Sequence, residues 1–454
     1  MAVVNSADVI VVGAGCAGLS AAVRAARAGR RVIVLEARSR LGGRATAFSD
    51  RETGELVDNG QHVLLGCYTA TFDFLREIGA SDHVRLQRQL QISIVDAQGR
   101  RSRFQCADLP TPFHLLAGIL DWDALSWTDR LAALKMATPL KLARRAMQPG
   151  SRTIAASPGE TVENWLIRNG QTPRLRELLW EPLALAALNQ SASEAAAPVF
   201  ARVLAEAFGS DARSAAIALP IVPLNRMYAE PARRYLEGHG GQVITGAAVK
   251  LRIEGDGRLT AAGPDQSWTA PQVVSAVPWF ALPDLFELPP PALAETFARA
   301  RATAASPIVT VNLWFDREVM DVPFLGLPGR VMQWAFDKRA VWGEDDHGAS
   351  QLSLVSSGAS SILALSNPEL VRIAHEEMMT ALPAARSAKL TRASVIREPN
   401  AGFSVAPGQP ARPSTVTGVR GFYLAGDWID TGLPATIESA VRSGHMAADA
   451  ILGG

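Results

Sequence analysis

The chain has 454 residues, in which 45 lysines and arginines balance 44 aspartates and glutamates. Hydrophobic residues make up 48% and charged residues 20% of the sequence, which is typical of a folded globular protein and unlike a disordered one. A net charge of +1 gives no general attraction to nucleic acid. We therefore expect two domains, or one domain with a large insertion, and no nucleic-acid partner.

Cysteine and histidine are sparse. The cysteines Cys16, Cys67 and Cys106 form no C-x-x-C pair, and the seven histidines show no spacing typical of metal ligands. We expect no disulfide framework, no metal site and a reducing, cytoplasmic location. The apolar run at the N-terminus is too short to cross a membrane and predicts a strand instead.

The first motif is a glycine-rich turn between a strand and a helix. Residues 8–12 are a short β-branched run, and an alanine-rich stretch with helical spacing follows the turn and stops at Gly29. A second apolar run, residues 31–37, ends in the acidic Glu36. This order predicts a βαβ unit that binds a dinucleotide. The glycines of the G-x-G-x-x-G frame are Gly13, Gly15 and Gly18.

Each part of this unit has an expected role. Gly13 permits the tight turn, Gly15 lets the backbone approach a pyrophosphate, and Gly18 lets helix and strand pack closely. The start of the helix, with Ala14 and Ala17 beside these glycines, favours an anion. Glu36 is expected to accept hydrogen bonds from the ribose hydroxyls.

The segment after Glu36 favours a flavin over a nicotinamide dinucleotide. It has the form E-A-x-x-x-x-G-G-R, which resembles the signature of flavin-dependent amine oxidases and carotenoid or phytoene desaturases. The resemblance implies that the diglycine approaches the pyrophosphate of FAD and that the arginine supports its charge. The cofactor-binding residues expected here are Ala37, Arg38, Gly42, Gly43 and Arg44.

The C-terminal segment resembles the closing motif of the same superfamily. A strand over 422–425 leads to Gly426 and Asp427, and a helix is predicted from about Thr436. The resemblance implies that Asp427 bonds the ribityl chain and that the helix start, Thr436 and Ile437, faces the flavin ring. The small residues that allow this helix to pack closely are Ala440, Ser443, Gly444 and Ala447.

Two further strand-like segments, 243–259 and 272–279, are expected to return to the cofactor domain. The resemblance places the Val249 backbone near the adenine and residues 276–278 alongside the cofactor. The predicted fold class is α/β: a Rossmann-like, doubly wound FAD-binding domain plus a mixed-sheet and helical substrate domain, as in flavin amine oxidases. The predicted FAD-binding domain comprises 1–68, 220–280 and 395–454, and the substrate domain comprises 69–219 and 281–394.

The substrate domain is expected to combine helices and strands. Residues 110–215 have helical patterns and form the predicted lid, with a capping box at 157–160. Strands are predicted at 307–315, 330–336 and 350–357, and a helix at 367–382. The proline-rich segment 288–293 is the predicted crossing between domains.

The segment 113–147 allows two interpretations, which are compatible. It is rich in leucine, alanine and tryptophan and ends in a cluster of basic residues. It can cover the substrate cavity as a lid, or its apolar face can contact a membrane surface peripherally, at the inner face of the membrane.

Departures from the amine-oxidase pattern argue against an amine substrate. Leu433 and Thr436 occupy positions where amine oxidases place aromatic side chains over the flavin. The candidate strand 306–315 lacks the lysine that these enzymes commonly carry, and 398–403 lacks the cysteine that links flavin covalently in some members. Noncovalent FAD is therefore expected.

One branch of the superfamily resembles the chain over nearly its whole length. The segment D-N-G-Q-H at 58–62, together with 332–338 and 426–444, is similar to hydroxysqualene dehydroxylases. The resemblance implies that Gly60, Gln61 and His62 reach the flavin. It also implies reductive removal of the allylic hydroxyl of hydroxysqualene, a long-chain isoprenoid, to give squalene, a hopanoid and triterpenoid precursor.

Several points stay open at this stage. The alternatives are a polyene desaturase of the carotenoid and phytoene type, a flavin amine oxidase, and a prenyl-binding escort protein that has lost its flavin. A single G-x-G-x-x-G frame leaves no second dinucleotide domain, so an external reductant is needed, for which NADPH is the candidate. His62 and Asp430 lie in segments expected near the ring, but neither is assigned as catalytic.

Overall fold

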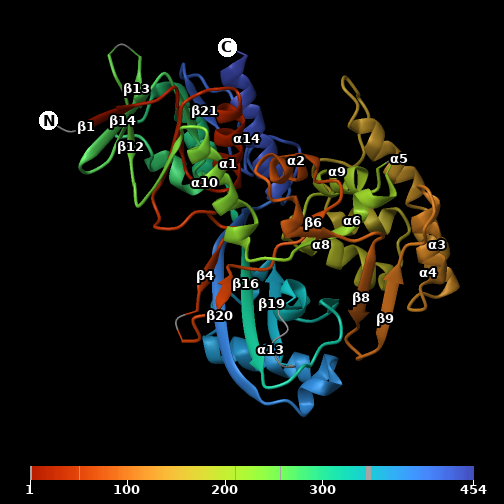
Figure 1. Ribbon diagram of the computed structural model, residues 1–454. Coiled ribbons are helices and arrows are strands. Elements are labelled where there is room, and N and C mark those ends of the chain that lie inside the picture. The colour runs from red at the N-terminus through yellow and green to blue at the C-terminus, as the bar shows by residue number, and fades with distance from the viewer. Residues whose placement is uncertain (1–2, 51, 210, 256, 344–348, 454) are drawn as a thin grey trace.

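The computed structural model describes residues 3–50, 52–209, 211–255, 257–343 and 349–453 (Figure 1). The predicted domain ranges that begin at residue 1 and end at residue 454 therefore extend beyond the described residues. Figure 1 shows the N-terminal strands and the C-terminal helix in one lobe, long strands below them, and a helical lobe to the right. The division into domains at the predicted boundaries stays a prediction.

The glycine-rich turn joins the two neighbouring strands of a five-stranded parallel sheet. The order is β11-β3-β2-β15-β21, and β2 and β3 are buried at every residue, as expected for a parallel sheet covered on both faces. The predicted strands around the turn and before the closing motif are confirmed. The strands are β2 Val9–Val12, β3 Val32–Glu36, β11 Gln242–Thr245, β15 Gln272–Ser275 and β21 Phe422–Leu424.

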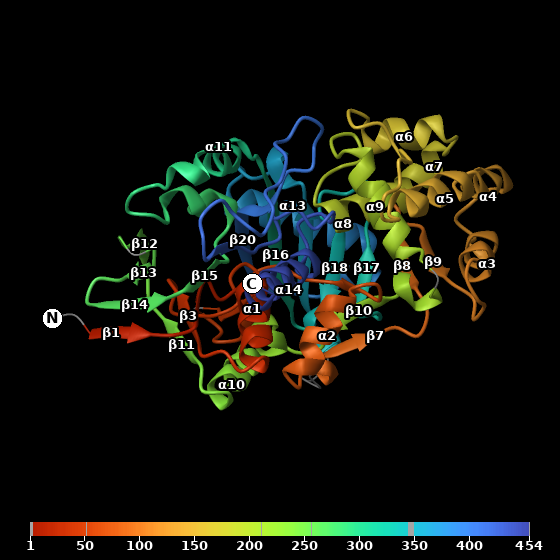
Figure 2. The same ribbon diagram turned by 90° about the horizontal axis from the view of Figure 1, so that it is seen from above.

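Three helices pack beside this sheet, as the view from above shows (Figure 2). Helix α1 (Cys16–Arg27) contacts both α10 (Glu230–Gly238) and α14 (Ile437–Leu452). The α1–α14 approach is close because Gly444 has no side chain: a Cβ there would lie 2.3 Å from the Ala17 carbonyl oxygen. The predicted role in close packing is thus confirmed for Gly444.

Smaller sheets flank the parallel one. The antiparallel hairpin of β4 (Ala47–Ser49) and β5 (Leu56–Asp58) leads into the D-N-G-Q-H segment. A four-stranded sheet has the order β1-β14-β13-β12, and a three-stranded sheet has the order β6-β10-β7. Their strands are β1 Val3–Ser6, β12 Lys250–Ile253, β13 Leu259–Ala262, β14 Gln266–Ala270, β6 Leu64–Leu65, β7 Val84–Leu86 and β10 Ile217–Pro220.

A seven-stranded sheet of order β20-β16-β19-β18-β17-β8-β9 forms the lower part of Figure 1. The predicted strand over 330–336 is mostly wrong, because Glu377 of α13 accepts the N–H groups of Val331 and Met332 at 2.8 and 2.9 Å. Only the end of that run pairs as a strand. The elements are β8 Gln91–Val95, β9 Arg101–Gln105, β16 Ala305–Phe315, β17 Phe324–Gly326, β18 Trp334–Asp337, β19 Gln351–Ser357, β20 Leu390–Phe403 and α13 Asn367–Ala381.

The predicted helical region is confirmed, but its capping box is wrong. Thr161, not Ser157, caps the helix and accepts the Asn164 N–H at 3.3 Å. Glu160 accepts the Ser157 N–H at 3.3 Å and pairs with Arg168, 2.8 Å away, and its own N–H bonds to the Ser157 carbonyl at 3.0 Å, so residues 157–160 form a turn before the helix. The helices are α3 Phe113–Asp121, α4 Trp127–Leu134, α5 Ala137–Ala146, α6 Val162–Arg168, α7 Pro173–Leu175, α8 Glu181–Leu188 and α9 Ala197–Ala207; elsewhere lie α2 Thr69–Glu77, α11 Ala294–Ala302 and α12 Lys338–Trp342.

Candidate functional site

The glycine-rich turn is built so that two of its glycines cannot carry side chains. Gly13 has a φ of +104°, and a Cβ there would lie 2.9 Å from the Ala276 carbonyl oxygen. A Cβ on Gly18 would lie 1.9 Å from the Gly13 carbonyl oxygen. Ala276 also donates its N–H to Val12 at 2.8 Å, so the structure brings the predicted segment 276–278 against the turn.

Gly15 differs from its neighbours because the space beside it is open. It is the N-cap of α1 with an ordinary φ of −83°, and no side chain caps the helix. A Cβ on Gly15 would meet only the Cα of Gly43, at 3.9 Å, and Gly42 donates its N–H to Ala14 at 2.9 Å. Bare backbone of the diglycine thus faces an uncapped helix start, an arrangement that fits a pyrophosphate. The other predicted residue on this helix, Ala17, is buried.

Glu36 lies at the end of β3 and is 7% exposed. Its carboxylate accepts the N–H of Ala14 at 2.8 Å and that of Arg38 at 2.9 Å, while the Arg38 and Ala37 residues themselves are exposed. Its carbonyl accepts the Ala247 N–H at 2.8 Å, two residues before the partly buried Val249. The remaining lone pairs of the carboxylate fit the predicted ribose contact.

The two ends of the chain meet in an ion pair. Arg44 lies 2.6 Å from Asp427, donates to the Ala401 carbonyl at 2.8 Å and stacks over the Trp279 ring at 5.6 Å. Burial opposes the charge of Arg44, but the Asp427 carboxylate outweighs burial and raises the pKa of the guanidinium. Gly426 donates to Ser443 at 2.8 Å, which fixes the closing turn on α14. Both Arg44 and Asp427 were predicted as cofactor-binding residues from the sequence, but the ion pair between them was not.

The D-N-G-Q-H segment is held by a buried lysine that sequence reasoning missed. Lys338 Nζ lies 2.7 Å from an Asp58 carboxylate oxygen, both side chains are 3% exposed, and Lys338 also donates to Gln61. His62 Nδ1 is 3.0 Å from the Gly60 carbonyl oxygen, and burial lowers the pKa of His62. Strand β16 contains no lysine, as predicted from its sequence. Instead, Lys338 of α12 contacts the D-N-G-Q-H segment.

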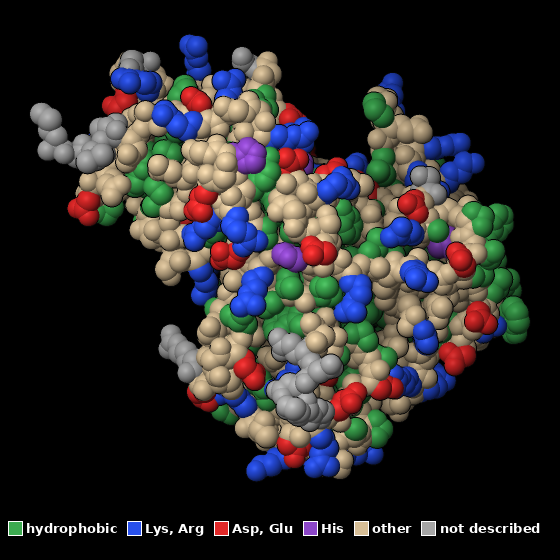
Figure 3. All heavy atoms as spheres, in the orientation of Figure 1, with side chains coloured by type: hydrophobic (Ala, Val, Ile, Leu, Met, Phe, Trp, Pro, Cys, Tyr) green, Lys and Arg blue, Asp and Glu red, His purple; other side chains and the backbone are tan. Residues whose placement is uncertain are grey.

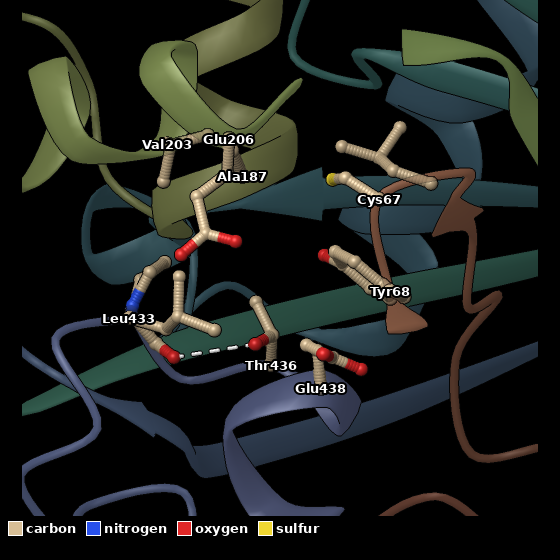
Figure 4. Close-up of a pocket in the computed structure, with 10 residues that line it drawn as sticks. Cys67, Tyr68, Ala187, Val203, Glu206, Leu433, Thr436 and Glu438 are labelled. Atoms are coloured by element: carbon tan, nitrogen blue, oxygen red, sulfur yellow. Dashed lines mark hydrogen bonds between the residues drawn. The ribbon is translucent and has the colours of Figure 1, made fainter. Parts of the chain in front are cut away.

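A narrow cavity adjoins the start of α14. Thr436 caps α14 by accepting the Ser439 N–H at 3.1 Å, and it lies at the cavity with Leu433 (Figure 4). Figure 4 shows the Tyr68 hydroxyl and the Glu206 carboxylate facing each other across this space, while the Thr436 hydroxyl is turned to the Pro434 carbonyl, 3.4 Å away. The lining residues are Leu65, Cys67, Tyr68, Ala187, Val203, Glu206, Leu433, Pro434, Thr436 and Glu438. Ile437, also predicted to face the ring, is the first residue of the helix.

Apart from Leu433 and Thr436, the cavity residues were not identified from the sequence, because they lie in segments that are far apart along the chain. The one available signal was the position of Cys67 and Tyr68 directly after the D-N-G-Q-H segment and its strand. Of the two candidate acids, Asp430 is 63% exposed at its side chain and pairs with Arg412 at 3.3 Å. In the structure, Asp430 therefore belongs to an ion pair at the protein surface.

Neither a metal centre nor a membrane span is found in the part of the chain that the structure describes. No three His, Cys, Asp or Glu side chains among those residues are grouped in a way that could hold a metal ion. No helix among them is both long and apolar enough to cross a bilayer.

Known proteins similar in sequence place these features in one family. Residues 16–452 match the family model described as flavin containing amine oxidoreductase. The chain is 31% identical to the hydroxysqualene dehydroxylase of Rhodopseudomonas palustris, over 98% of this chain and 99% of that protein. It is 30% identical to the enzyme of that name from Sinorhizobium fredii, over 98% of both chains. A 15-cis-phytoene desaturase from an Oncidium hybrid cultivar is 28% identical, over 98% of this chain and 78% of that protein.

Solved structures confirm the predicted fold class. A putrescine oxidase superposes with a TM-score of 0.73 at 18% identity, covering 100% of both chains. Cyclohexylamine oxidase from Brevibacterium oxydans gives 0.71 at 16% identity, covering 98% of this chain and 99% of the other. At such identities the likeness concerns the fold alone. The predicted resemblance is confirmed by the family match: the chain belongs to the flavin containing amine oxidoreductases, a family of oxidoreductases with a flavin cofactor.

Proposed function

We propose that this oxidoreductase binds FAD noncovalently and reductively removes the allylic hydroxyl of hydroxysqualene to give squalene. The observation that carries the proposal is a small cavity at the start of α14, whose walls are mostly apolar and carry a few polar groups. Leu433 and Thr436 provide no pair of rings for an amine, whereas Tyr68 provides a hydroxyl beside them. The names of the relatives point to isoprenoid substrates.

A second, larger cavity supports an extended hydrocarbon substrate. It is an open groove of about 1470 Å³, counting the part open to solvent, and most of its lining is apolar. Val199 lines the groove and Val203, one turn further along α9, lines the narrow cavity, while Leu433 lines both. The groove is thus placed to hold the hydrocarbon of a substrate whose reacting end lies at the narrow cavity. Other residues of the groove include Ile154, Ala155, Pro198 and Val405.

The chain's contribution to this reaction is positioning, exclusion of water and charge control. The α1 start and the diglycine would hold the pyrophosphate, Glu36 the ribose, and the Arg44–Asp427 pair the region of the ribityl chain. When bound there, reduced flavin would supply a hydrogen with two electrons to the allylic carbon. The apolar lining keeps water from a cation at that carbon, and a protein donor must protonate the departing oxygen.

The test is a single anaerobic turnover with chemically reduced FAD and no NADPH. Hydrogen on reduced flavin exchanges with solvent, so squalene formed in deuterated buffer should carry deuterium at the allylic carbon, unlike a flavin-free control. Repeating the turnover with NADPH as sole reductant asks whether that donor can serve. Unlabelled squalene, or new double bonds made by the oxidised enzyme, would replace this function with that of a polyene desaturase.

FAD should be released completely by acid. No cysteine lies in 398–403, and the described cysteines Cys16, Cys67 and Cys106 are all free thiols, Cys16 and Cys106 being buried. Burial raises the pKa of Cys16 to about 12, which disfavours a reactive thiolate. After acid precipitation, all yellow colour is expected in the supernatant. Colour in the pellet contradicts noncovalent binding, and a colourless preparation favours the flavin-free escort protein.

We further propose that α3 and α4 contact a membrane surface. Apolar side chains gather at the right-hand edge of Figure 3, over these helices. Phe113, Trp127 and Leu131 are 58%, 68% and 61% exposed, and the basic Arg144 and Arg145 of α5 are exposed nearby in sequence. A patch of this kind suits the interface of an anionic bilayer.

Vesicle sedimentation tests this contact. Replacing Trp127 and Leu131 together by serine should weaken binding to anionic vesicles at least tenfold, because each lost side chain removes about 1.5 to 3 kcal/mol of apolar burial. Ile253→Ser, at a 43% exposed position on β12, is the matched control and should bind as wild type. Equal binding of all three proteins would show that the helices serve only as a lid.

A further inference from the structure

The narrow cavity at the start of α14 has the size and lining of a site for one hydroxyl group. It has room for about one water molecule. Its walls come from three distant parts of the chain: the segment before α2, the neighbouring helices α8 and α9, and the loop and first turn at α14 (Figure 4). Apolar walls leave its few polar groups to decide what it binds.

The two carboxylates of the cavity are already committed to other groups. Glu206 accepts from Arg442 at 2.8 and 3.1 Å and from Arg202 at 2.9 Å. Arg442 lies behind the cavity on α14, and it holds the pKa of Glu206 below its usual range against the effect of burial. Glu206 is therefore ionised and accepts hydrogen bonds only, so it has no proton to give.

Glu438 is likewise engaged. Its oxygens accept the N–H groups of Ala70 and Thr71 at 3.1 and 2.9 Å, the Thr71 hydroxyl at 2.7 Å, and Arg442 Nε at 2.8 Å. These bonds tie the start of α2 to α14. Because Tyr68 directly precedes α2, they also fix the backbone that carries the Tyr68 side chain.

Tyr68 is the remaining oxygen acid. Burial, with the neighbouring Cys67 and Glu438, raises its pKa, and a hydrogen bond with Thr436 only partly opposes this. The Thr436 hydroxyl itself lies 3.4 Å from the Pro434 carbonyl. Burial also raises the pKa of Cys67 to about 12, and a thiol is a weak hydrogen-bond donor. Tyr68 thus stays protonated at neutral pH, with its hydroxyl in the cavity.

We propose that this cavity receives the hydroxyl oxygen of the substrate and that Tyr68 Oη donates the proton with which that oxygen leaves as water. The inference rests on the proposed dehydroxylation and names its acid. Neither His62 nor Asp430 lines this cavity. His62 forms a hydrogen bond within its own segment, and Asp430 is part of an exposed ion pair.

The step balances. The allylic C–O bond breaks with its electron pair on oxygen, the Tyr68 O–H bond breaks, and a new O–H bond completes water. Bound reduced flavin would supply that carbon with a hydrogen and two electrons, and solvent would return a proton to the phenolate. Even with its pKa raised by burial, the Tyr68 hydroxyl is a stronger acid than water, so transfer of its proton to the departing hydroxide is favourable.

The first test compares wild type with Tyr68→Phe in a single anaerobic turnover of hydroxysqualene. The phenylalanine keeps the ring and removes the proton, so the rate of squalene formation should fall about 100- to 10,000-fold. Tyr235→Phe, the same change on α10 outside the cavity, should react within about threefold of wild type. If wild type makes no squalene, the proposed function itself fails; if wild type reacts and Tyr68→Phe keeps pace, only the role of Tyr68 is overturned.

The second test separates proton donation from shape. The allylic chloride analogue of the substrate needs no proton for its leaving group. Tyr68→Phe should therefore convert the chloride to squalene at a rate within about threefold of wild type, after subtraction of the enzyme-free reaction. Equal losses with alcohol and chloride would show a structural role and overturn the proposal.

A binding measurement gives a readout that does not depend on turnover. Quenching of tryptophan fluorescence in the oxidised protein reports the Kd for hydroxysqualene and for squalene. Loss of one neutral hydrogen bond in Tyr68→Phe should raise the Kd for the alcohol about two- to twelvefold and leave that for squalene unchanged. Equal Kd values for the alcohol in both proteins would place its hydroxyl elsewhere.

Discussion

A Gly15→Val substitution is expected to yield a folded protein that purifies without flavin. Gly15 has an ordinary φ, and a Cβ there would meet only the Cα of Gly43 at 3.9 Å, so the turn itself tolerates a side chain. The valine would instead occupy the space between the helix start and the diglycine, where the pyrophosphate is expected. The measurement is the ratio of flavin to protein absorbance, with circular dichroism to confirm folding.

Two comparison variants sharpen this result. Gly159→Val, at a glycine with no neighbour within 4 Å of its Cβ position, should keep a full complement of flavin. Glu36→Ala should weaken FAD binding by about 1 to 3 kcal/mol, since it loses hydrogen bonds but leaves the pyrophosphate space open. Full flavin content in Gly15→Val would mean that the loop is a plain turn.

Lys338→Met is expected to destabilise the protein by about 3 to 5 kcal/mol. The substitution removes the cation from a pair whose side chains are both 3% exposed. It leaves the Asp58 carboxylate buried, still accepting the Leu224 N–H at 3.0 Å. It also releases Gln61 and hence the segment expected to reach the flavin. Urea unfolding followed by tryptophan fluorescence measures the change in the free energy of unfolding.

A second substitution tests whether the unpaired charge of Asp58 causes the loss of stability. Adding Asp58→Asn to Lys338→Met removes the unpaired charge while the amide oxygen can still accept the Leu224 N–H, so the double variant should regain part of the loss. Lys389→Met, at an exposed lysine, should change stability by less than about 0.5 kcal/mol. A loss below about 1 kcal/mol in Lys338→Met would show that the pair contributes little.

The sequence by itself determined the dinucleotide-binding framework, because local geometry dictates it. A strand, a G-x-G-x-x-G turn, a helix, and a strand ending in Glu36 are contiguous, and only glycine fits at Gly13 and Gly18. The closing strand and helix were predictable for the same reason: their apolar spacing and the cap at Thr436 lie within one short segment. The family signatures were likewise local.

Segment boundaries depended on tertiary contacts. The strand predicted over 330–336 begins only at Trp334, since a glutamate of α13 takes the N–H groups that a neighbouring strand would otherwise bind. The helix predicted from 157–160 begins at Val162, since Thr161 caps it, while Glu160 bonds to Ser157 within a turn and pairs with Arg168. A pattern read along the chain does not contain these competing partners.

The polar interior was decided by the tertiary structure alone. Lys338 and Asp58 are 280 positions apart, Arg44 and Asp427 are 383 apart, and Arg442 and Glu206 are 236 apart. Each pair forms because burial makes an isolated charge costly, so the fold brings opposite charges together from unrelated segments. The cavity that holds Tyr68 arises in the same way, from walls that meet only when three distant parts of the chain have packed.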